Sequence, residues 1–306
     1  MIAGHNWTKR FFYGNYFYGI CAVALSVECS LQLQLPLNSI LFYLALFCAT
    51  VLYYTHAYYV ETQQQLEHRN DRAFWYKTHQ KQITQSQLGL TFILGLLLLL
   101  LFNGLQPLFA QLPFYNWIIL LIFGLIGAAY YKSLYPGWGN WGLRNNGLIK
   151  PFLIGCVWAG AVSFAPVLFY DLSHPGAAHT AEIITWLLFL KNWLFISLLC
   201  ILFDIKDYAT DANQPLKTWV VKMGLRKTLF GLIIPIAFIS LGIYWLLAWL
   251  EDFSISRIIF NTIPYILLIT VSTQMHRRKS ILYYLAIIDG LMLVKAICGA
   301  MGMLGI

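Results

Sequence analysis

Nine stretches of the chain are long and apolar enough to cross a lipid bilayer as helices, and they constrain its fold more than any other feature. A helix needs about 20 mostly apolar residues to span the hydrocarbon core. Only 10% of the residues are charged, against roughly 25% in soluble domains. The sequence therefore predicts an all-α, polytopic membrane protein with a single domain over residues 1–306. The predicted spans are approximately 15–34, 37–59, 88–106, 114–131, 148–170, 182–203, 228–249, 256–273 and 281–304.

The distribution of lysine and arginine predicts the orientation of these spans. With the N-terminus inside, 17 of the 20 basic residues lie in cytoplasmic segments, and the other three are Lys191, Arg257 and Lys295. Basic residues are enriched in cytoplasmic loops, where they also meet anionic lipid. We expect the N-terminus and the loops at 60–87, 132–147 and 204–227 to face the cytoplasm of a bacterial inner membrane. The net charge of +8 then needs no nucleic-acid partner.

Three acids stand together where the sixth span would leave the membrane, in the segment FDIKDYATDANQPLKTWVVKMG at 203–224. Asp204, Asp207 and Asp211 are spaced i, i+3 and i+7, which places them within about 60° on one helix face. Carboxylates so close repel each other unless water or a cation neutralises them. Mg²⁺ suits such a site, since it binds one or two carboxylates and completes its shell with water and phosphate oxygens. The alternative is a solvated helix whose acids pair with nearby lysines.

Two further segments accompany the acidic one: YYKSLYPGWGNWGLRNNGLIKPFLIGCVWAG at 130–160 and YYLAIIDGLMLVKAICG at 283–299. The acidic segment resembles the second aspartate motif of the UbiA-type intramembrane prenyltransferase superfamily, including its Lys-Thr step and Met-Gly ending. The segment at 130–160 is similar to the one that joins the fourth and fifth helices of that family. The segment at 283–299 resembles the last helix of bacterial members. Nine helices and a length of about 300 residues also match the family.

The resemblance implies a helical barrel around a central cavity that opens to the membrane. Family members bind an isoprenyl diphosphate through Mg²⁺ and transfer the prenyl group to an aromatic or other lipophilic acceptor. The resemblance makes Asp204, Asp207 and Asp211 the catalytic and metal-binding residues. Metal and basic groups would stabilise the charge of the departing diphosphate. The basic residues implied to contact this diphosphate are Lys132, Arg144, Lys150 and Lys217.

The first aspartate motif of the family, N-D-x-x-D-x-x-x-D at the inner end of the second helix, is degenerate in this chain. Thr55 and His56 stand where Asn-Asp is expected, and Glu61 is the only acid between positions 57 and 64. One alternative is that His56 and Glu61 substitute for the missing acids. The other is that His56 is an ordinary interfacial residue. A chain without these carboxylates is expected to hold a second metal ion poorly.

Several ionisable residues fall inside the predicted spans, where they are costly and are usually paired or functional. Glu28 lies in the first span, Lys191 in the sixth, and Asp289 and Lys295 in the ninth. We expect Lys191 to pair with Glu28 or Asp289. Asp289 and Lys295 are six residues apart and do not share a helix face, so each needs a partner elsewhere. A proton or solute path is the alternative, although inverted repeats typical of transporters are missing.

Two hypotheses for the function follow. The first is an enzyme, a Mg²⁺-dependent prenyltransferase that acts on an isoprenyl diphosphate and a lipophilic acceptor; the acidic segment favours it. The second is a catalytically inactive protein of the same fold that binds a polyprenyl lipid or serves as a subunit of a membrane assembly. The degenerate segment at 55–64 favours the second.

Overall fold

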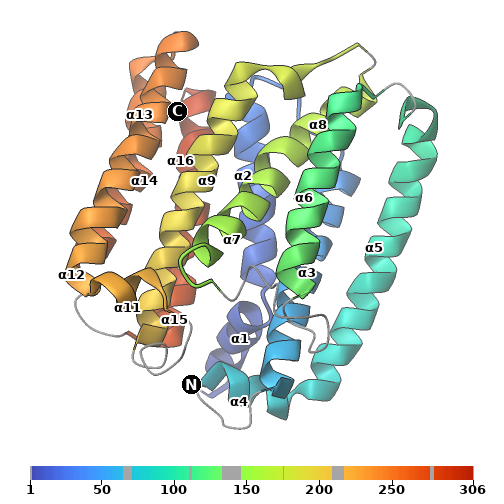
Figure 1. The fold of residues 1–306 in the computed structure, drawn as a ribbon. Helices are drawn as coiled ribbons and strands as arrows, with labels where there is room; N and C mark the ends of the chain where they lie inside the picture. The colour runs from blue at the N-terminus through green and yellow to red at the C-terminus, as the bar shows by residue number, and fades with distance from the viewer. Residues whose placement is uncertain are drawn as a thin grey trace.

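The computed structural model describes residues 2–64, 71–109, 112–132, 146–174, 176–208, 217–275 and 279–305, and all regular structure within these ranges is helical. The long helices run side by side as a bundle (Figure 1). Seven of them are long and apolar enough to cross a membrane. The prediction of an all-α, polytopic membrane protein is therefore confirmed.

The elements of the N-terminal half are α1 (Ile2–Tyr13), α2 (Tyr16–Gln32), α3 (Ile40–Gln64), α4 (Asp71–Thr78), α5 (Gln80–Phe109), α6 (Phe114–Lys132), α7 (Lys150–Ala159), η2 (Gly160–Phe164) and α8 (Ala165–Ser173). Those of the C-terminal half are η3 (His179–Ala181), α9 (Ile183–Asp204), η4 (Ile205–Asp207), α11 (Trp219–Met223), α12 (Leu225–Thr228), η5 (Leu229–Ile233), α13 (Ile234–Leu250), α14 (Ile255–Thr273), α15 (Ile281–Tyr283), η6 (Tyr284–Ile288) and α16 (Gly290–Leu304). The elements η2, η5 and η6 are π-helical turns, each inside a continuous helix.

The count of nine spans is not confirmed. The predicted spans at 15–34 and 114–131 are helical but are not among these seven. Helix α2 has 17 residues, and the apolar helix described within α6 is Phe114–Gly127. Helix α2 is short because the backbone takes a left-handed conformation on both sides of it, with φ of 64° at Asn15 and 56° at Gln34. A separate helix, α1, precedes that break, and the sequence analysis did not anticipate it.

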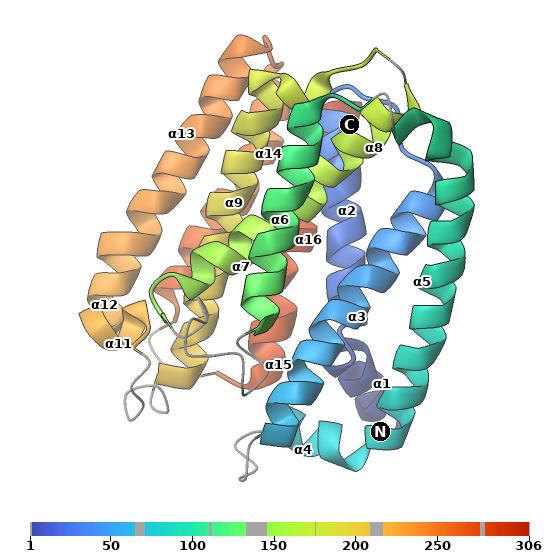
Figure 2. The same cartoon turned by 45° about the vertical axis from the view of Figure 1, so that its right-hand side comes forward.

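Helices α2, α9 and α16 lie at the centre of the packing. Helix α2 contacts α3 and α16, helix α9 contacts α7 and α13, and α14 packs on α16. Helix α5 packs mainly on α3 along one edge of the bundle (Figure 2). Only 6% of its apolar span is buried, so its leucines face outward, as expected for a helix in contact with lipid. The predicted barrel around a central cavity stays a prediction.

The short helices gather at one end of the bundle. Helices α1, α4, α11 and α15 all lie at the end where the chain begins, and the C-terminus lies at the opposite end (Figures 1 and 2). We call the first of these the N-terminal end. Helix α9 finishes there with Asp204, and α7 starts there with Lys150. The segments in which the sequence places its candidate site residues therefore meet at the same end.

Candidate functional site

The acidic segment begins inside the bundle and then emerges from it. Asp204, in the last turn of α9, is only 9% exposed. The helix then tightens into the 3-10 turn η4, and the side chain of Asp207 is 42% exposed. Lys206 Nζ lies 3.2 Å from Asp207 Oδ2 and 4.5 Å from the ring centroid of Phe203. A buried and a half-exposed carboxylate thus stand close to a lysine, whereas Asp211 lies outside the described residues.

Two of the predicted basic residues come from segments that are packed against each other. The indole nitrogen of Trp219 donates to the carbonyl oxygen of Leu148 at 2.8 Å. The segment of Trp219 also passes close to Gly147, where a Cβ atom would lie 2.8 Å from the carbonyl oxygen of Lys217 and would collide with it. These contacts bring the start of α7, with Lys150, beside Lys217. Lys150 is half-buried and Lys217 is exposed.

The remaining predicted diphosphate contacts are outside what the structure describes. Arg144 falls in the gap between the described ranges 112–132 and 146–174. Lys132 is the last residue of α6, and its side chain is not among those described. Their role stays a prediction. Cys200, one turn before Asp204, interacts electrostatically with Asp204, Asp289 and Lys150, which places these three charged groups around one part of α9.

An aromatic group lies deeper in the bundle. The rings of Tyr18 and Tyr54 stack with centroids 4.7 Å apart, and Trp158 lies 5.8 Å from Tyr54. The indole N–H of Trp158 donates to the Tyr54 hydroxyl. The Tyr18 hydroxyl in turn donates to Asp289 Oδ2 at 2.6 Å. These contacts join α2, α3, α7 and α16, and no local pattern in the sequence distinguishes these rings from the chain's other aromatic residues.

Asp289 follows directly on the π-helical turn η6. The wide turn is closed by the backbone N–H of Asp289, which donates to the carbonyl oxygen of Tyr284 at 3.0 Å. Turns of this kind occur often at functional sites. Asp289 is 6% exposed and interacts electrostatically with both Arg72 and Lys206. It therefore connects the aromatic group with the charged groups at the N-terminal end.

Thr55, at the start of the degenerate first motif, contacts neutral groups. Thr55 is buried, and its hydroxyl accepts from Asn15 Nδ2 at 3.0 Å and donates to the carbonyl oxygen of Gly14 at 3.3 Å. His56 is exposed. The side chain of Glu61 is not among those described, so the possible substitution by His56 and Glu61 stays untested. The structure does separate Thr55 from His56, since one faces inward and the other outward.

Next to Thr55 stands a buried arginine that the sequence analysis treated only as a cytoplasmic basic residue. Arg72, in α4, is 1% exposed. Its Nη2 donates to Asn15 Oδ1 at 2.5 Å and to the carbonyl oxygen of Tyr13 at 3.3 Å. Its guanidinium carbon lies 3.5 Å from the ring centroid of Tyr58. Burial opposes the charged form, but Tyr58 and Tyr76 favour it and raise the pKa of Arg72 above its usual value, so the group remains a cation.

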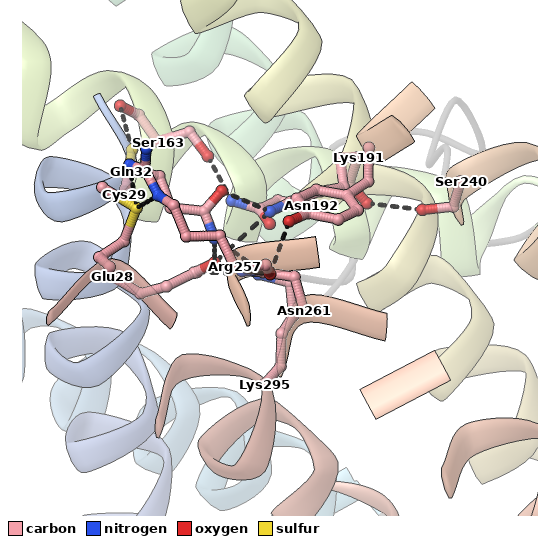
Figure 3. Close-up of polar contacts among 12 residues, drawn as sticks. Glu28, Cys29, Gln32, Ser163, Lys191, Asn192, Ser240, Arg257, Asn261 and Lys295 are labelled. Atoms are coloured by element: carbon pink, nitrogen blue, oxygen red, sulfur yellow. Dashed lines mark hydrogen bonds and ion pairs between the residues drawn. The ribbon is translucent and has the colours of Figure 1, made fainter. Parts of the chain in front are cut away.

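A second polar cluster lies away from the N-terminal end, and Figure 3 shows its side chains converging from several helices. Glu28 binds two lysines: its Oε2 lies 2.8 Å from Lys295 Nζ and its Oε1 lies 3.4 Å from Lys191 Nζ. Gln32 Nε2 donates to Glu28 Oε1 and to Asn261 Oδ1, both at 2.6 Å. Lys191 precedes Asp204 by 13 residues, roughly 20 Å along the helix.

The expected pairing of these buried charges is confirmed in its main points. Lys191 pairs with Glu28, which was one of its two expected partners. Asp289 and Lys295 do not pair with each other; Asp289 accepts from Tyr18 and Lys295 binds Glu28. The sequence analysis did not expect one carboxylate to serve both lysines.

The described residues offer a limited set of metal ligands. In the described ranges no group of three or more His, Cys, Asp or Glu side chains is placed to hold a metal ion. Asp204 and Asp207 remain as two described carboxylates. Mg²⁺ typically takes only one or two carboxylates and fills its shell with water and phosphate oxygens. These residues therefore fit a single ion shared with a phosphorylated ligand, and no acid of the first motif is described that would hold a second.

Comparison with known proteins places the fold. No family model matches the chain, and no curated protein matches it. Among solved structures, a digeranylgeranylglyceryl phosphate synthase studied in membranes, a UbiA-type intramembrane prenyltransferase, matches with a TM-score of 0.56 over 94% of this chain and 93% of its own. The sequence identity is 16%. The match confirms, at the level of the fold, the resemblance seen in the sequence.

Proposed function

We propose that this integral membrane protein transfers an isoprenyl group from an isoprenyl diphosphate to a lipophilic or aromatic acceptor within the membrane, with Mg²⁺. The observation that carries the proposal is the buried carboxylate of Asp204, the last residue of α9, at the N-terminal end of the bundle. It lies close to Lys206 in a fold shared with a membrane prenyltransferase. Asp204, Asp207 and Asp211 are the metal-binding residues in this proposal.

The charged residues would bind the metal ion and the diphosphate. Bound Mg²⁺ would neutralise the charge that develops on the leaving diphosphate. Asp204 and Asp207 would hold the ion, and Lys206 would exchange its contact with Asp207 for an anionic oxygen. Lys150 and Lys217 stand on segments that are packed together, and both ammonium groups would attract the same diphosphate. Lys132 and Arg144 complete the proposed set.

The aromatic group would protect the reactive intermediate. Loss of diphosphate leaves an allylic cation, which the faces of aromatic rings stabilise. Tyr18, Tyr54 and Trp158 are mutually packed. Their packing would keep water away from the cation until the acceptor reacts. These aromatic contacts identify neither the acceptor nor the length of the prenyl chain.

A second candidate function is lipid binding without turnover. The observation that favours it is Thr55, which stands where the first motif would begin and accepts a hydrogen bond from Asn15. In that case the protein would bind a polyprenyl diphosphate, or join a membrane assembly, and release no diphosphate.

The experiment that tests the proposal uses purified protein in lipid nanodiscs with a radiolabelled isoprenyl diphosphate and a membrane lipid extract as acceptor source. We expect label to enter a lipophilic product with Mg²⁺ and not with EDTA. Asp204→Asn keeps the size of the side chain and removes its charge, and we expect it to lower the rate by at least about 100-fold, as removal of an electrostatic stabiliser does. The matched control is Asp252→Asn, an exposed acid in the loop after α13.

Two results would decide against the proposal. Diphosphate binding without transfer, measured by calorimetry on the same sample, would favour the second function. Absence of diphosphate binding with and without Mg²⁺ would exclude the enzyme and the diphosphate-binding form of the second function.

A further inference from the structure

Arg72 is a buried cation, and most of its N–H donors lack a hydrogen-bond partner among the described residues. The guanidinium has five N–H donors and no acceptor. Among the described residues, Nη2 donates to Asn15 and to the backbone of Tyr13, and the Tyr76 side chain also interacts with the guanidinium. Nε and Nη1 are buried and have no hydrogen-bond partner among the described residues. A buried donor that is left unsatisfied lowers the stability of the folded state, and a charged one lowers it more.

Its positive charge also has no acid within ion-pair distance among the described residues. Of the ion pairs among the described residues, none involves Arg72. Its close neighbours are the neutral rings of Tyr58 and Tyr76, with the guanidinium carbon 3.5 and 5.9 Å from their centroids. A buried charge normally has a partner of opposite sign, because removing it from water is expensive. The surroundings of Arg72 are therefore those of an anion-binding group whose anion is a ligand.

The position of Arg72 relates it to the candidate site. Asn15 joins Arg72 to Thr55, the residue at which the first aspartate motif would begin. Arg72 also interacts electrostatically with Asp289, which interacts in the same way with Lys206 next to Asp204. A cleft of about 190 Å³ reaches the other side of Thr55, between α1, α4 and the start of α5, and Arg72 is not part of its lining. The positive group thus stands on the side where the acids are missing.

We propose that Arg72 binds an anionic oxygen of the isoprenyl diphosphate through its free N–H groups and takes over the charge neutralisation that a second metal ion, held by first-motif acids, would provide. This inference rests on the proposed function and extends it to the half of the site without carboxylates. A guanidinium suits the task because its planar N–H groups match phosphate oxygens in pairs. The guanidinium is held in place by Asn15 and stacked on Tyr58, and its free N–H groups are buried, so a ligand that reaches them displaces a neighbouring side chain.

This assignment explains why the loss of acids is compatible with diphosphate binding. Acids in the first motif are useful only when a metal ion lies between them and the diphosphate. A fixed cation contacts the diphosphate directly, and carboxylates beside it would compete for its N–H groups. Thr55 and Asn15 are neutral, so they position Arg72 without consuming its charge.

The test measures binding of inorganic pyrophosphate by calorimetry to the purified full-length protein in detergent, once with EDTA and once with Mg²⁺. We expect measurable binding with EDTA, and a loss of about 10- to 100-fold in affinity for Arg72→Gln, the usual range for removing a charged hydrogen-bonding group. Arg72→Lys keeps the charge but not the paired N–H groups, and we expect an intermediate loss. The control is Lys81→Gln, an exposed basic residue at the same end of the bundle, with unchanged affinity.

A purely structural role for Arg72 gives a different pattern. In that case Arg72→Gln lowers the unfolding temperature of the unliganded protein, yet pyrophosphate still raises that temperature as much as in the wild type. If Arg72→Gln does not fold, the pyrophosphate affinity and the rise in unfolding temperature are compared between Arg72→Lys and the wild type. Equal pyrophosphate affinity of a folded Arg72 variant and the wild type, with EDTA and with Mg²⁺, overturns the inference.

Two further arms separate this inference from the proposed function and from lipid binding. If the wild type binds pyrophosphate only with Mg²⁺, and Asp204→Asn but not Arg72→Gln weakens it, the inference fails and the proposed function stands. If the wild type binds pyrophosphate under neither condition, both fail. Nanodiscs with and without phosphatidylglycerol test whether the phosphate that Arg72 binds belongs to a lipid. If pyrophosphate binds in the nanodiscs without phosphatidylglycerol and does not bind when this lipid is present, Arg72 holds a lipid phosphodiester, which also overturns the inference.

Discussion

Glu28 illustrates how a single residue decides the stability of a charged cluster inside a membrane protein. Its two carboxylate oxygens contact Lys191 and Lys295, and its exposed fraction is 0%. Gln32 bridges the cluster to Asn261, and Lys191 also faces the ring of Tyr244 with its ammonium nitrogen 5.2 Å from the centroid. Removing one partner of such a group leaves a buried charge that no water can reach.

We therefore expect Glu28→Gln to destabilise the protein by about 3–5 kcal/mol, the range for breaking a buried ion pair. Equilibrium unfolding in detergent with increasing SDS measures this effect. The double variant Glu28→Gln with Lys191→Met is expected to recover part of the loss, because it removes one of the unpaired cations. Asp252→Asn, an exposed acid far from the cluster in sequence, serves as control, and equal stability of Glu28→Gln and wild type would contradict the prediction.

At the scale of elements, the contact between α2 and α16 depends on a glycine. Gly299 faces Glu28, and a Cβ atom at this position would lie 2.5 Å from Glu28 Cγ. The two helices approach closely there because no side chain intervenes, which is a common device in helix packing within membranes. The same approach brings Lys295, one helical turn earlier in α16, to the Glu28 carboxylate.

Gly299→Ala is expected to lower the stability by about 1–3 kcal/mol, since overpacking forces backbone or side-chain shifts. Gly290→Ala, at the start of the same helix, is the matched control because its Cβ meets open space. Thermal unfolding of both variants distinguishes packing from helix propensity. A lower unfolding temperature for Gly290→Ala than for Gly299→Ala would show that the close approach is not what stabilises the helix pair.

At the scale of the whole molecule, the arrangement of the ends agrees with the distribution of basic residues. Helices α1, α4 and α11, which together carry five of the 20 lysines and arginines, lie at the N-terminal end of the bundle (Figure 1). The positive-inside rule assigns this end to the cytoplasm. We therefore predict that this end of the bundle, with the candidate site, faces the cytoplasm.

Cysteine labelling tests this orientation. Lys81→Cys places a thiol at the N-terminal end, and Ala178→Cys places one in the loop between α8 and α9 at the other end; both positions are exposed. In spheroplasts of a bacterial host, we expect a membrane-impermeant maleimide to label Ala178→Cys at once and Lys81→Cys only after the membrane is opened. The wild type, with its six native cysteines, gives the background. The reverse labelling order would invert the proposed location of the site.

The sequence by itself determined the membrane-spanning helical fold, the acidic end of α9 and the need of Lys191 for an acidic partner. Hydropathy and charge patterns depend on residues that are neighbours in the sequence, so these properties can be predicted without knowing the tertiary structure. Only the tertiary structure decided that one carboxylate, Glu28, serves two lysines and that Arg72 from a short loop helix is buried beside Thr55. Those contacts depend on the rotation of each helix about its axis and on the direction that the chain takes at Asn15, between α1 and α2. Both are set by packing among residues far apart in the chain.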